Sequence, residues 1–242
     1  MKRLFDIVVS FCGLLLLLPI LLLLIILVWL QDFKSPFYIA KRVGQHGNTF
    51  NMIKLRSMMV GADKIGAMST SVNDKRITLI GHFIRASKLD EFMQLWNVLI
   101  GDMSLVGPRP NTWKYGVELY TNEEKRLFDL KPGITDFASI VFSDEGNILS
   151  NSANPDVMYN QLIRPWKSRL GLIYLDARSM LLDIKLIMIT IVGIISHKMA
   201  LRLVVKELQK LGVDEDVICV AERKHQLIPT PPPGSEYIYQ DR

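Results

Sequence analysis

The sequence predicts an α+β protein, with a membrane anchor at its amino terminus, a short β-hairpin and a set of amphipathic helices. Three observations support this class. An uncharged apolar run fills most of the first 30 residues, a strand-turn-strand pattern follows near residues 35–55, and apolar residues later recur at helical spacing. We divide the 242 residues into an anchor (1–32), a globular domain (33–200) and a carboxy-terminal extension of unknown role (201–242).

The apolar run from Ile7 to Leu30 contains no charged residue. As a helix it would extend about 36 Å, whereas the hydrocarbon core of a bilayer is about 30 Å thick. No small-residue cleavage pattern follows it, which disfavours a secretory signal peptide. Pro19 lies near the middle of the run, where it removes a backbone donor and is expected to kink the helix.

Two topologies of the anchor remain open from these residues. Basic residues flank the run on both sides, namely Lys2, Arg3, Lys34, Lys41 and Arg42. The positive-inside rule therefore gives no clear orientation, and a spanning helix and a re-entrant hairpin are equally compatible with the sequence. The net charge of +5 suits anionic lipids and anionic substrates. No basic cluster with interleaved aromatic residues indicates nucleic-acid binding.

The globular part begins with two strand-like segments, 35–39 and 49–55, around a turn, which predict a β-hairpin. Apolar residues at spacings of three and four predict one amphipathic helix over 84–100, and a shorter helix is expected over 122–130. Residues 180–195 form an apolar segment interrupted by two charges, too short to span a bilayer. It is expected to be a core helix or, as we prefer, a helix in the membrane interface. The proline-rich tail is expected to be extended or disordered.

Asp90 and Glu91 are adjacent carboxylates that permit two interpretations. In the structural one, Ser87 caps a helix and Asp90 stands three residues later, as in a capping box. In the functional one, a helix start attracts phosphate, one carboxylate attacks phosphorus and the other holds a metal ion. The residues alone leave both interpretations open.

Basic residues could complete a phosphate site. Lys54 and Arg56 stand two apart in an expected strand and so on one face of it, and Arg109 lies between two prolines. For each of them an ordinary surface charge is the alternative. Glycine-rich phosphate loops and histidines at metal-ligand spacing are absent from the sequence. These residues indicate a membrane-bound enzyme of phosphate chemistry, compatible with metal assistance.

Over roughly residues 1–195 the chain resembles the bacterial sugar transferase family, the monotopic phosphoglycosyl transferases that begin glycan assembly. The most specific shared motifs are SKLDE (87–91), QLWNVL (94–99), GDMS (101–104) and VGPRP (106–110). Further shared motifs are KRLFD (2–6), KLRSM (54–58), DKRIT (74–78), KPGIT (131–135) and LDIK (182–185).

The resemblance implies a re-entrant membrane hairpin that breaks at Pro19, with the catalytic domain on the cytoplasmic face of the bacterial inner membrane. It implies transfer of a sugar-1-phosphate from a UDP-sugar to polyprenyl (undecaprenyl) phosphate with release of UMP, as the first membrane step of exopolysaccharide, O-antigen, capsule or glycoprotein assembly. Asp90 would form a covalent phosphosugar intermediate in a ping-pong reaction, and Glu91 would bind Mg²⁺. The residues implied to hold phosphates are Lys54, Arg56, Arg85 and Arg109.

The partners implied are a UDP-sugar, polyprenyl phosphate and membrane lipids, with no nucleic acid and with a homodimer left open. The chain departs from the family where Asp136-Phe-Ala-Ser139 replaces the more usual Gly-Trp-Ala-Gln, where Leu18 replaces a serine before Pro19, and where Ala40 replaces a glutamine. Two rival functions stay open. One is a hydrolytic relative acting on nucleotide-sugars, and the other is a non-catalytic membrane scaffold in which Asp90 is only a cap.

Overall fold

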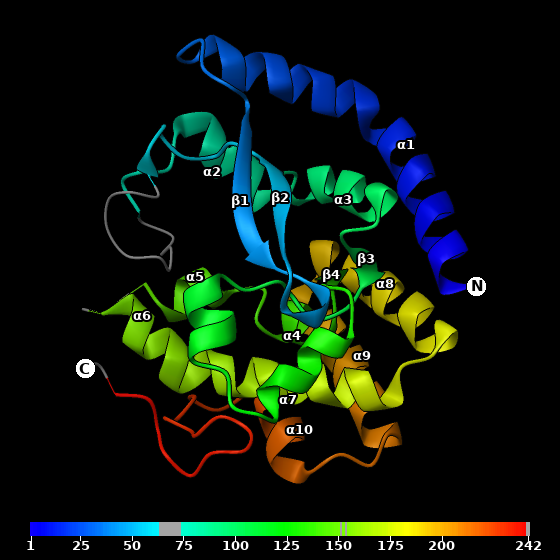
Figure 1. The fold of residues 1–242 in the computed structure, drawn as a ribbon, viewed down its shortest axis with the longest axis vertical. Helices are drawn as coiled ribbons and strands as arrows, with labels where there is room; N and C mark the ends of the chain where they lie inside the picture. The colour runs from blue at the N-terminus through cyan, green and yellow to red at the C-terminus, as the bar shows by residue number, and fades with distance from the viewer. Residues whose placement is uncertain (63–73, 151, 153, 241–242) are drawn as a thin grey trace.

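The computed structural model describes residues 1–62, 74–150, 152 and 154–240. A long helix, α1 (Lys2–Leu30), arches along one side of a domain in which helices surround two small sheets (Figure 1). The mixed helix and sheet content confirms the predicted α+β class. The helix α1 continues through Pro19 without a break, although it is visibly curved (Figure 1). It is long and apolar enough to cross a membrane, and its orientation there stays a prediction.

The predicted hairpin is confirmed. Strands β1 (Phe37–Val43) and β2 (Thr49–Leu55) pair antiparallel over their whole length, from Phe37 opposite Leu55 to Val43 opposite Thr49. The connecting turn uses Gly47 at a positive φ of 76°, a conformation that glycine adopts without strain. The hairpin places Lys54 near the end of β2, next to the elements that follow.

The single helix expected over 84–100 is wrong, because the chain turns in the middle of that segment. Helix α2 (Leu79–Ala86) ends at Ser87, whose hydroxyl donates to the carbonyl of Phe83 at 2.7 Å. Lys88 then adopts a left-handed conformation, with φ of 55°. A short 3₁₀ turn (Glu91–Met93) leads into α3 (Gln94–Ile100), which ends at Gly101. Asp90 and Glu91 therefore stand at a sharp turn between two helices.

Two three-residue strands, β3 (Ser104–Val106) and β4 (Gly133–Thr135), pair in parallel. Their ends approach each other more closely than side chains would allow. A Cβ on Gly133 would lie 2.1 Å from the backbone nitrogen of Gly107, and a Cβ on Gly107 would lie 2.4 Å from the carbonyl oxygen of Lys131. These glycines fix where the Gly107–Pro110 segment leaves the sheet, and with it the position of Arg109.

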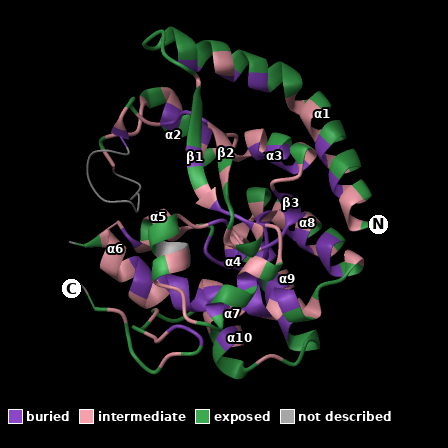
Figure 2. Ribbon diagram, in the orientation of Figure 1, coloured by how far each residue is buried: buried purple, intermediate pink, exposed green. Residues whose placement is uncertain are grey.

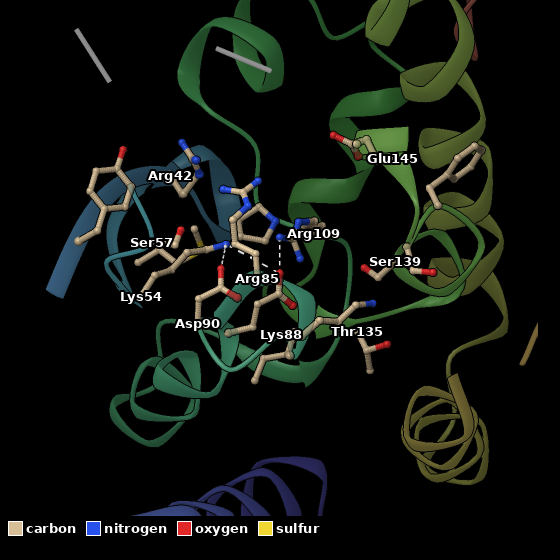
Figure 3. Close-up of a pocket in the computed structure, with 18 of the residues that line it drawn as sticks. Arg42, Lys54, Ser57, Arg85, Lys88, Asp90, Arg109, Thr135, Ser139 and Glu145 are labelled. Carbon is tan, nitrogen blue, oxygen red and sulfur yellow. Dashed lines mark hydrogen bonds and ion pairs between the residues drawn. The ribbon is translucent and has the colours of Figure 1, made fainter. Parts of the chain in front are cut away.

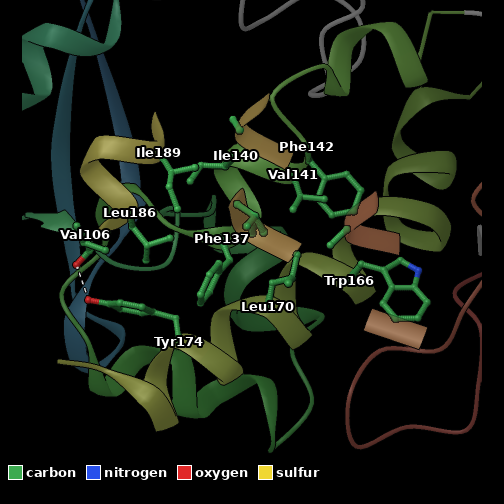
Figure 4. Packing of buried hydrophobic residues seen from close by; sticks show 14 of the residues in the cluster. Val106, Phe137, Ile140, Val141, Phe142, Trp166, Leu170, Tyr174, Leu186 and Ile189 are labelled. Carbon is green, nitrogen blue, oxygen red and sulfur yellow. Dashed lines mark hydrogen bonds between the residues drawn. The ribbon is translucent and has the colours of Figure 1, made fainter. Parts of the chain in front are cut away.

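Helices build the rest of the domain. They are α4 (Phe137–Val141), α5 (Glu145–Ile148), α6 (Pro155–Met158), α7 (Arg164–Ala177), α8 (Met180–Ile195), α9 (His197–Lys210) and α10 (Glu215–Glu222). The short helix expected over 122–130 is present as a 3₁₀ helix, Glu124–Asp129. Phe137, Leu170, Tyr174 and Leu186 pack together at the centre of the core, which α4, α7 and α8 share (Figure 4).

The segment after residue 200 packs on the domain. The expected division at residue 200 falls within α9, and residues on both sides of it, such as Ala200 and Val204, belong to the same core. The proline-rich tail is extended and hydrogen-bonded: the amide of Thr230 donates to the carbonyl of Gln161 at 3.0 Å, and Arg169 donates to that of Pro231 at 2.9 Å.

Polar contacts tie α1 to the domain near both of its ends. At the first end, Lys2 pairs with Asp183 at 2.6 Å, and Asp6 accepts a hydrogen bond from Ser104 at 2.9 Å. At the other end, Arg56 donates to Asp32 at 2.5 and 2.6 Å. The same guanidinium donates to the carbonyl of Val28 at 3.2 Å.

Between these ties, α1 buries a narrow stripe and exposes a wide apolar face, which is mostly green in Figure 2. A wide exposed apolar face of this size marks a surface that contacts lipid or protein.

Gly133→Ala tests the close approach of β3 and β4. The added methyl group would overlap backbone atoms, which cannot move as a flexible side chain can, so we expect a loss of about 2–3 kcal/mol in unfolding free energy. Thermal unfolding of the purified protein would measure it. Gly193→Ala in α8 is the matched control, because its Cβ would lie 3.4 Å from that of Ala200, an ordinary contact, and alanine favours helix. Equal melting temperatures for the two variants would contradict the proposed constraint.

Candidate active site

A cavity of about 960 Å³ lies on one side of the β-hairpin. Its wall combines β2, the turn between α2 and α3, the segment after β3, the β4–α4 connection, and parts of α5, α7 and α8. Figure 3 shows basic side chains from several of these elements gathered around Asp90. A volume of this size accommodates a ligand as large as a nucleotide-sugar.

Asp90 and Glu91 have different partners although they are adjacent. Glu91 accepts a hydrogen bond from Arg109 at 2.5 Å and lies 3.8 Å from the ammonium group of Lys54. Asp90 lies 3.8 Å from the same ammonium group, which is beyond hydrogen-bond distance. Both carboxylates are largely buried, with exposed side-chain fractions of 13% for Asp90 and 23% for Glu91.

These partners move the two pKa values in opposite directions. Burial raises the pKa of Asp90, and Lys54 offsets only part of this effect. Burial also acts on Glu91, but Arg109 and Lys54 outweigh it and hold the pKa of Glu91 at about 2. The pKa of Lys54 is lowered, first by burial and then by the positive charge of Arg109. Glu91 is therefore the firmly ionised carboxylate, and the ionised form of Asp90 is the less stabilised of the two.

The structure brings together most of the residues that the sequence suggested. Lys54, Asp90, Glu91 and Arg109 form one cluster of ion pairs, and Arg85 lines the same cavity. The interpretation of Asp90 as only a helix cap is wrong. Its side chain makes no capping hydrogen bond, and Ser87 ends the preceding helix instead of starting the next.

Arg56 has a different environment from the one expected of a phosphate ligand. Although it borders the cavity, its guanidinium is committed to Asp32 and to the carbonyl of Val28, and only 9% of its side chain is exposed. Lys54 belongs to strand β2, whereas Arg56 lies just beyond its end and fastens the anchor. Its assignment to a phosphate stays a prediction.

Several residues that line the cavity were not predicted from the sequence as site residues. Arg42 and Lys88 add positive charge, and Glu145, paired with Lys167, stands on the far wall (Figure 3). Lys88 belongs to the SKLDE motif and could have been included. Arg42 was noted only as a basic residue that flanks the apolar run, and Glu145 and Lys167 come from elements distant in the chain.

The described residues offer limited ligands for a metal ion. They contain no group of three or more histidine, cysteine, aspartate or glutamate side chains placed to hold one. Mg²⁺ at enzyme sites is commonly bound by one or two carboxylates together with water and substrate phosphates. Glu91, with Asp90 beside it, fits that mode of binding, and a complete coordination sphere then requires a bound substrate.

Comparison with known proteins identifies a family for this chain. The bacterial sugar transferase profile matches residues 1–197. The chain is 37% identical over 196 residues to an undecaprenyl-phosphate glucose phosphotransferase of Komagataeibacter xylinus, covering 78% of this chain and 35% of that protein. It is 34% identical over 205 residues to the UDP-glucose:undecaprenyl-phosphate glucose-1-phosphate transferase of Xanthomonas campestris pv. campestris, covering 82% and 40% respectively.

A third relative has a similar length. The uncharacterized sugar transferase EpsL of Bacillus subtilis (strain 168) is 34% identical over 193 residues, which cover 79% of this chain and 85% of that protein. In contrast, the chain spans only about a third of the length of several curated relatives. The match to the profile includes the anchor, the cluster around Asp90 and helix α8. The chain belongs to the bacterial sugar transferase family.

Proposed function

We propose that this protein transfers a sugar-1-phosphate from a UDP-sugar to polyprenyl (undecaprenyl) phosphate, releasing UMP. The observation that carries the proposal is the pair Asp90 and Glu91, held at the wall of a cationic cavity next to a long apolar helix. The names of two relatives state that they act on undecaprenyl phosphate. In this proposal the protein catalyses the first membrane step in assembling a bacterial glycan.

The reaction proceeds in two displacements at one phosphorus atom. A carboxylate oxygen of Asp90 attacks the phosphorus next to the sugar. The bond from that phosphorus to the bridging oxygen breaks, and UMP leaves with the bond's electron pair. A phosphate oxygen of the polyprenyl phosphate then attacks the aspartyl phosphosugar, which frees Asp90 and forms a polyprenyl diphosphate sugar. Asp90 suits the first step because, among the described residues, its carboxylate has no hydrogen bond that would have to be broken, and Lys54 lies 3.8 Å away.

The surrounding charges have distinct tasks. Arg109 presents a planar fork of donors to phosphate oxygens while it keeps Glu91 ionised, and Lys54 lies between both carboxylates. Arg85 adds a cation on the same side of the cavity. Glu91 would hold Mg²⁺, which, when bound, neutralises charge on the diphosphate.

The contacts of α1 favour a re-entrant anchor. Lys2 and Asp6 near one end, and Asp32 just beyond the other, bond to the same folded domain. A helix that is tied near both ends to one domain returns to the side of the membrane from which it started. With basic residues on both flanks, the proposed side is the cytoplasmic face of the inner membrane.

Asp90→Asn separates a nucleophile from a structural residue. The amide has the size of the carboxylate, so we expect the unfolding free energy to change by less than about 1 kcal/mol. Turnover should fall by at least about a thousandfold, because the amide lacks the charge that attacks phosphorus. Intact-protein mass spectrometry after incubation with a UDP-sugar alone should show a phosphosugar adduct only on the unaltered protein.

Asp176→Asn is the matched control, since it breaks an ion pair with Arg126 on the surface, away from the cavity, and should keep both the adduct and the turnover. A folded Asp90→Asn protein with normal turnover would exclude the covalent mechanism. UMP release that continues without any lipid phosphate would instead indicate hydrolysis, the rival reaction.

Metal dependence tests the task of Glu91. Thorough chelation should abolish turnover and added Mg²⁺ should restore it, because in this proposal the ion held by Glu91 neutralises charge on the diphosphate. Glu91→Gln should raise the Mg²⁺ concentration needed for half-maximal rate, measured as UMP release at saturating substrates. The assignment of Glu91 would be wrong if this variant kept both its rate and the same Mg²⁺ requirement.

A further inference from the structure

Helix α8 carries two apolar stripes with different surroundings. Ile187, Ile191 and Ile194 recur at spacings of four and three, and all three line the cavity. A second stripe is exposed and does not line the cavity formed by the described residues. Its members are Leu181, Met188 and Ile195, seven residues apart.

Successive residues in a helix point about 100° apart, so the two stripes face different directions. Ile191 and Ile194 also keep 49% and 59% of their surface exposed. The cavity is therefore open along the first stripe.

The first stripe lines the same cavity as Asp90 and Glu91. Thr190, next to Ile191 on α8, hydrogen-bonds through its hydroxyl to that of Thr135 at 2.6 Å, which fixes α8 against the end of β4. Figure 3 shows Thr135 along the lower side of the cavity, with Lys88 drawn between it and Asp90. Apolar side chains also line the cavity elsewhere, namely Phe92, Leu95 and Ile140. The apolar lining reaches the carboxylate pair, because Phe92 follows Glu91 directly in the chain. We call these apolar lining residues, together with the first stripe, the apolar arm of the cavity.

Charge is distributed unevenly where the arm meets the cluster. Lys54 and Arg109 already pair with Asp90 or Glu91. Arg85 and Lys88 also line the cavity, and within the described part of the chain neither has a carboxylate within 4.0 Å. A phosphate group placed at this junction would gain these two cations without breaking an existing ion pair.

We propose that the arm is the binding site of the lipid acceptor: the first isoprene units lie against Ile187, Ile191 and Ile194, and the phosphate meets Lys88 and Arg85. This inference rests on the proposed function and assigns the site of its second substrate. A UDP-sugar has no apolar tail that would use the arm, whereas a polyprenyl phosphate has an apolar chain joined directly to a phosphate. In this proposal, the second stripe of α8 contacts membrane lipid.

Ile194→Ser and Ile195→Ser provide a matched pair, because they make the same change at adjacent positions on different faces of α8. The measurement uses the full-length protein in nanodiscs, with undecaprenyl phosphate as acceptor. Ile194→Ser should raise the KM for undecaprenyl phosphate about tenfold, as expected from losing the contact of one isoleucine side chain with an apolar chain. The burst of UMP released with UDP-sugar alone should stay unchanged. Ile195→Ser should alter neither quantity.

Two outcomes would overturn the site. If both variants raise KM equally, the whole helix only contacts the bilayer. If Ile194→Ser reduces the UMP burst and leaves the KM for the acceptor unchanged, the arm belongs to the donor. Lys88→Gln should also raise the KM for undecaprenyl phosphate, and more strongly at low ionic strength, where charge pairing is less screened.

A binding measurement keeps this inference separate from the reaction. A polyprenyl phosphate that carries a benzophenone should crosslink to the α8 peptide of the unaltered protein. Excess undecaprenyl phosphate should suppress this crosslink, and phosphatidylglycerol should not. Crosslinks that phosphatidylglycerol suppresses equally would overturn the site. If the crosslinks are specific but the protein releases no UMP with any UDP-sugar, the lipid-binding site would be supported and the proposed transfer reaction would be refuted.

Discussion

The geometry of the whole protein depends on how α1 is bonded to the domain. Asp6, Asp183 and Arg56 are almost fully buried, and each is paired. Removing the partner of one of these groups would leave a buried polar or charged group without compensation, which is unfavourable. These contacts therefore hold α1 in one register against α3 and β3, where apolar packing alone would permit sliding.

The same contacts couple the anchor to the active site. Asp6 bonds to Ser104 in β3, and β3 leads within a few residues to Arg109. At the other end, Arg56 bonds to Asp32 and follows Lys54 by two residues. The two cations that surround the carboxylate pair thus stand close in the chain to the two points where the membrane helix is fastened. If α1 lies in the membrane as proposed, these contacts would fix the position of the cavity relative to the lipid surface.

The sequence predicted those parts of the molecule that local patterns encode. The hairpin was predicted from strand-like composition on both sides of a turn that contains glycine, and the cluster of Lys54, Asp90, Glu91 and Arg109 from family motifs. The continuous helix over 84–100 was wrong because its apolar spacing persists across the turn. No residue type marks a left-handed Lys88 in advance, since propensity gives little weight to single residues at positive φ.

Long-range pairings explain the remaining gaps. Arg56 was predicted to bind phosphate because its actual partner, Asp32, lies 24 residues away in the sequence, at the end of an apolar run, and no local pattern links the two. The segment after residue 200 had no recognised motif, yet α9 fills the core through ordinary aliphatic residues such as Val204 and Leu208. Tertiary packing determines contacts of this kind, and a short segment of the sequence does not specify them.

Site-directed labelling tests whether both ends of α1 lie on the same side of the membrane. In a background with Cys12 and Cys219 replaced by serine, one variant carries a cysteine inserted after Met1 and another carries Lys34→Cys. A membrane-impermeant maleimide is applied to inside-out vesicles and to intact spheroplasts. We expect both positions to react in inside-out vesicles and neither to react in spheroplasts. Labelling of the amino-terminal cysteine in spheroplasts, with position 34 protected there, would mean that α1 spans the membrane and would contradict the re-entrant topology.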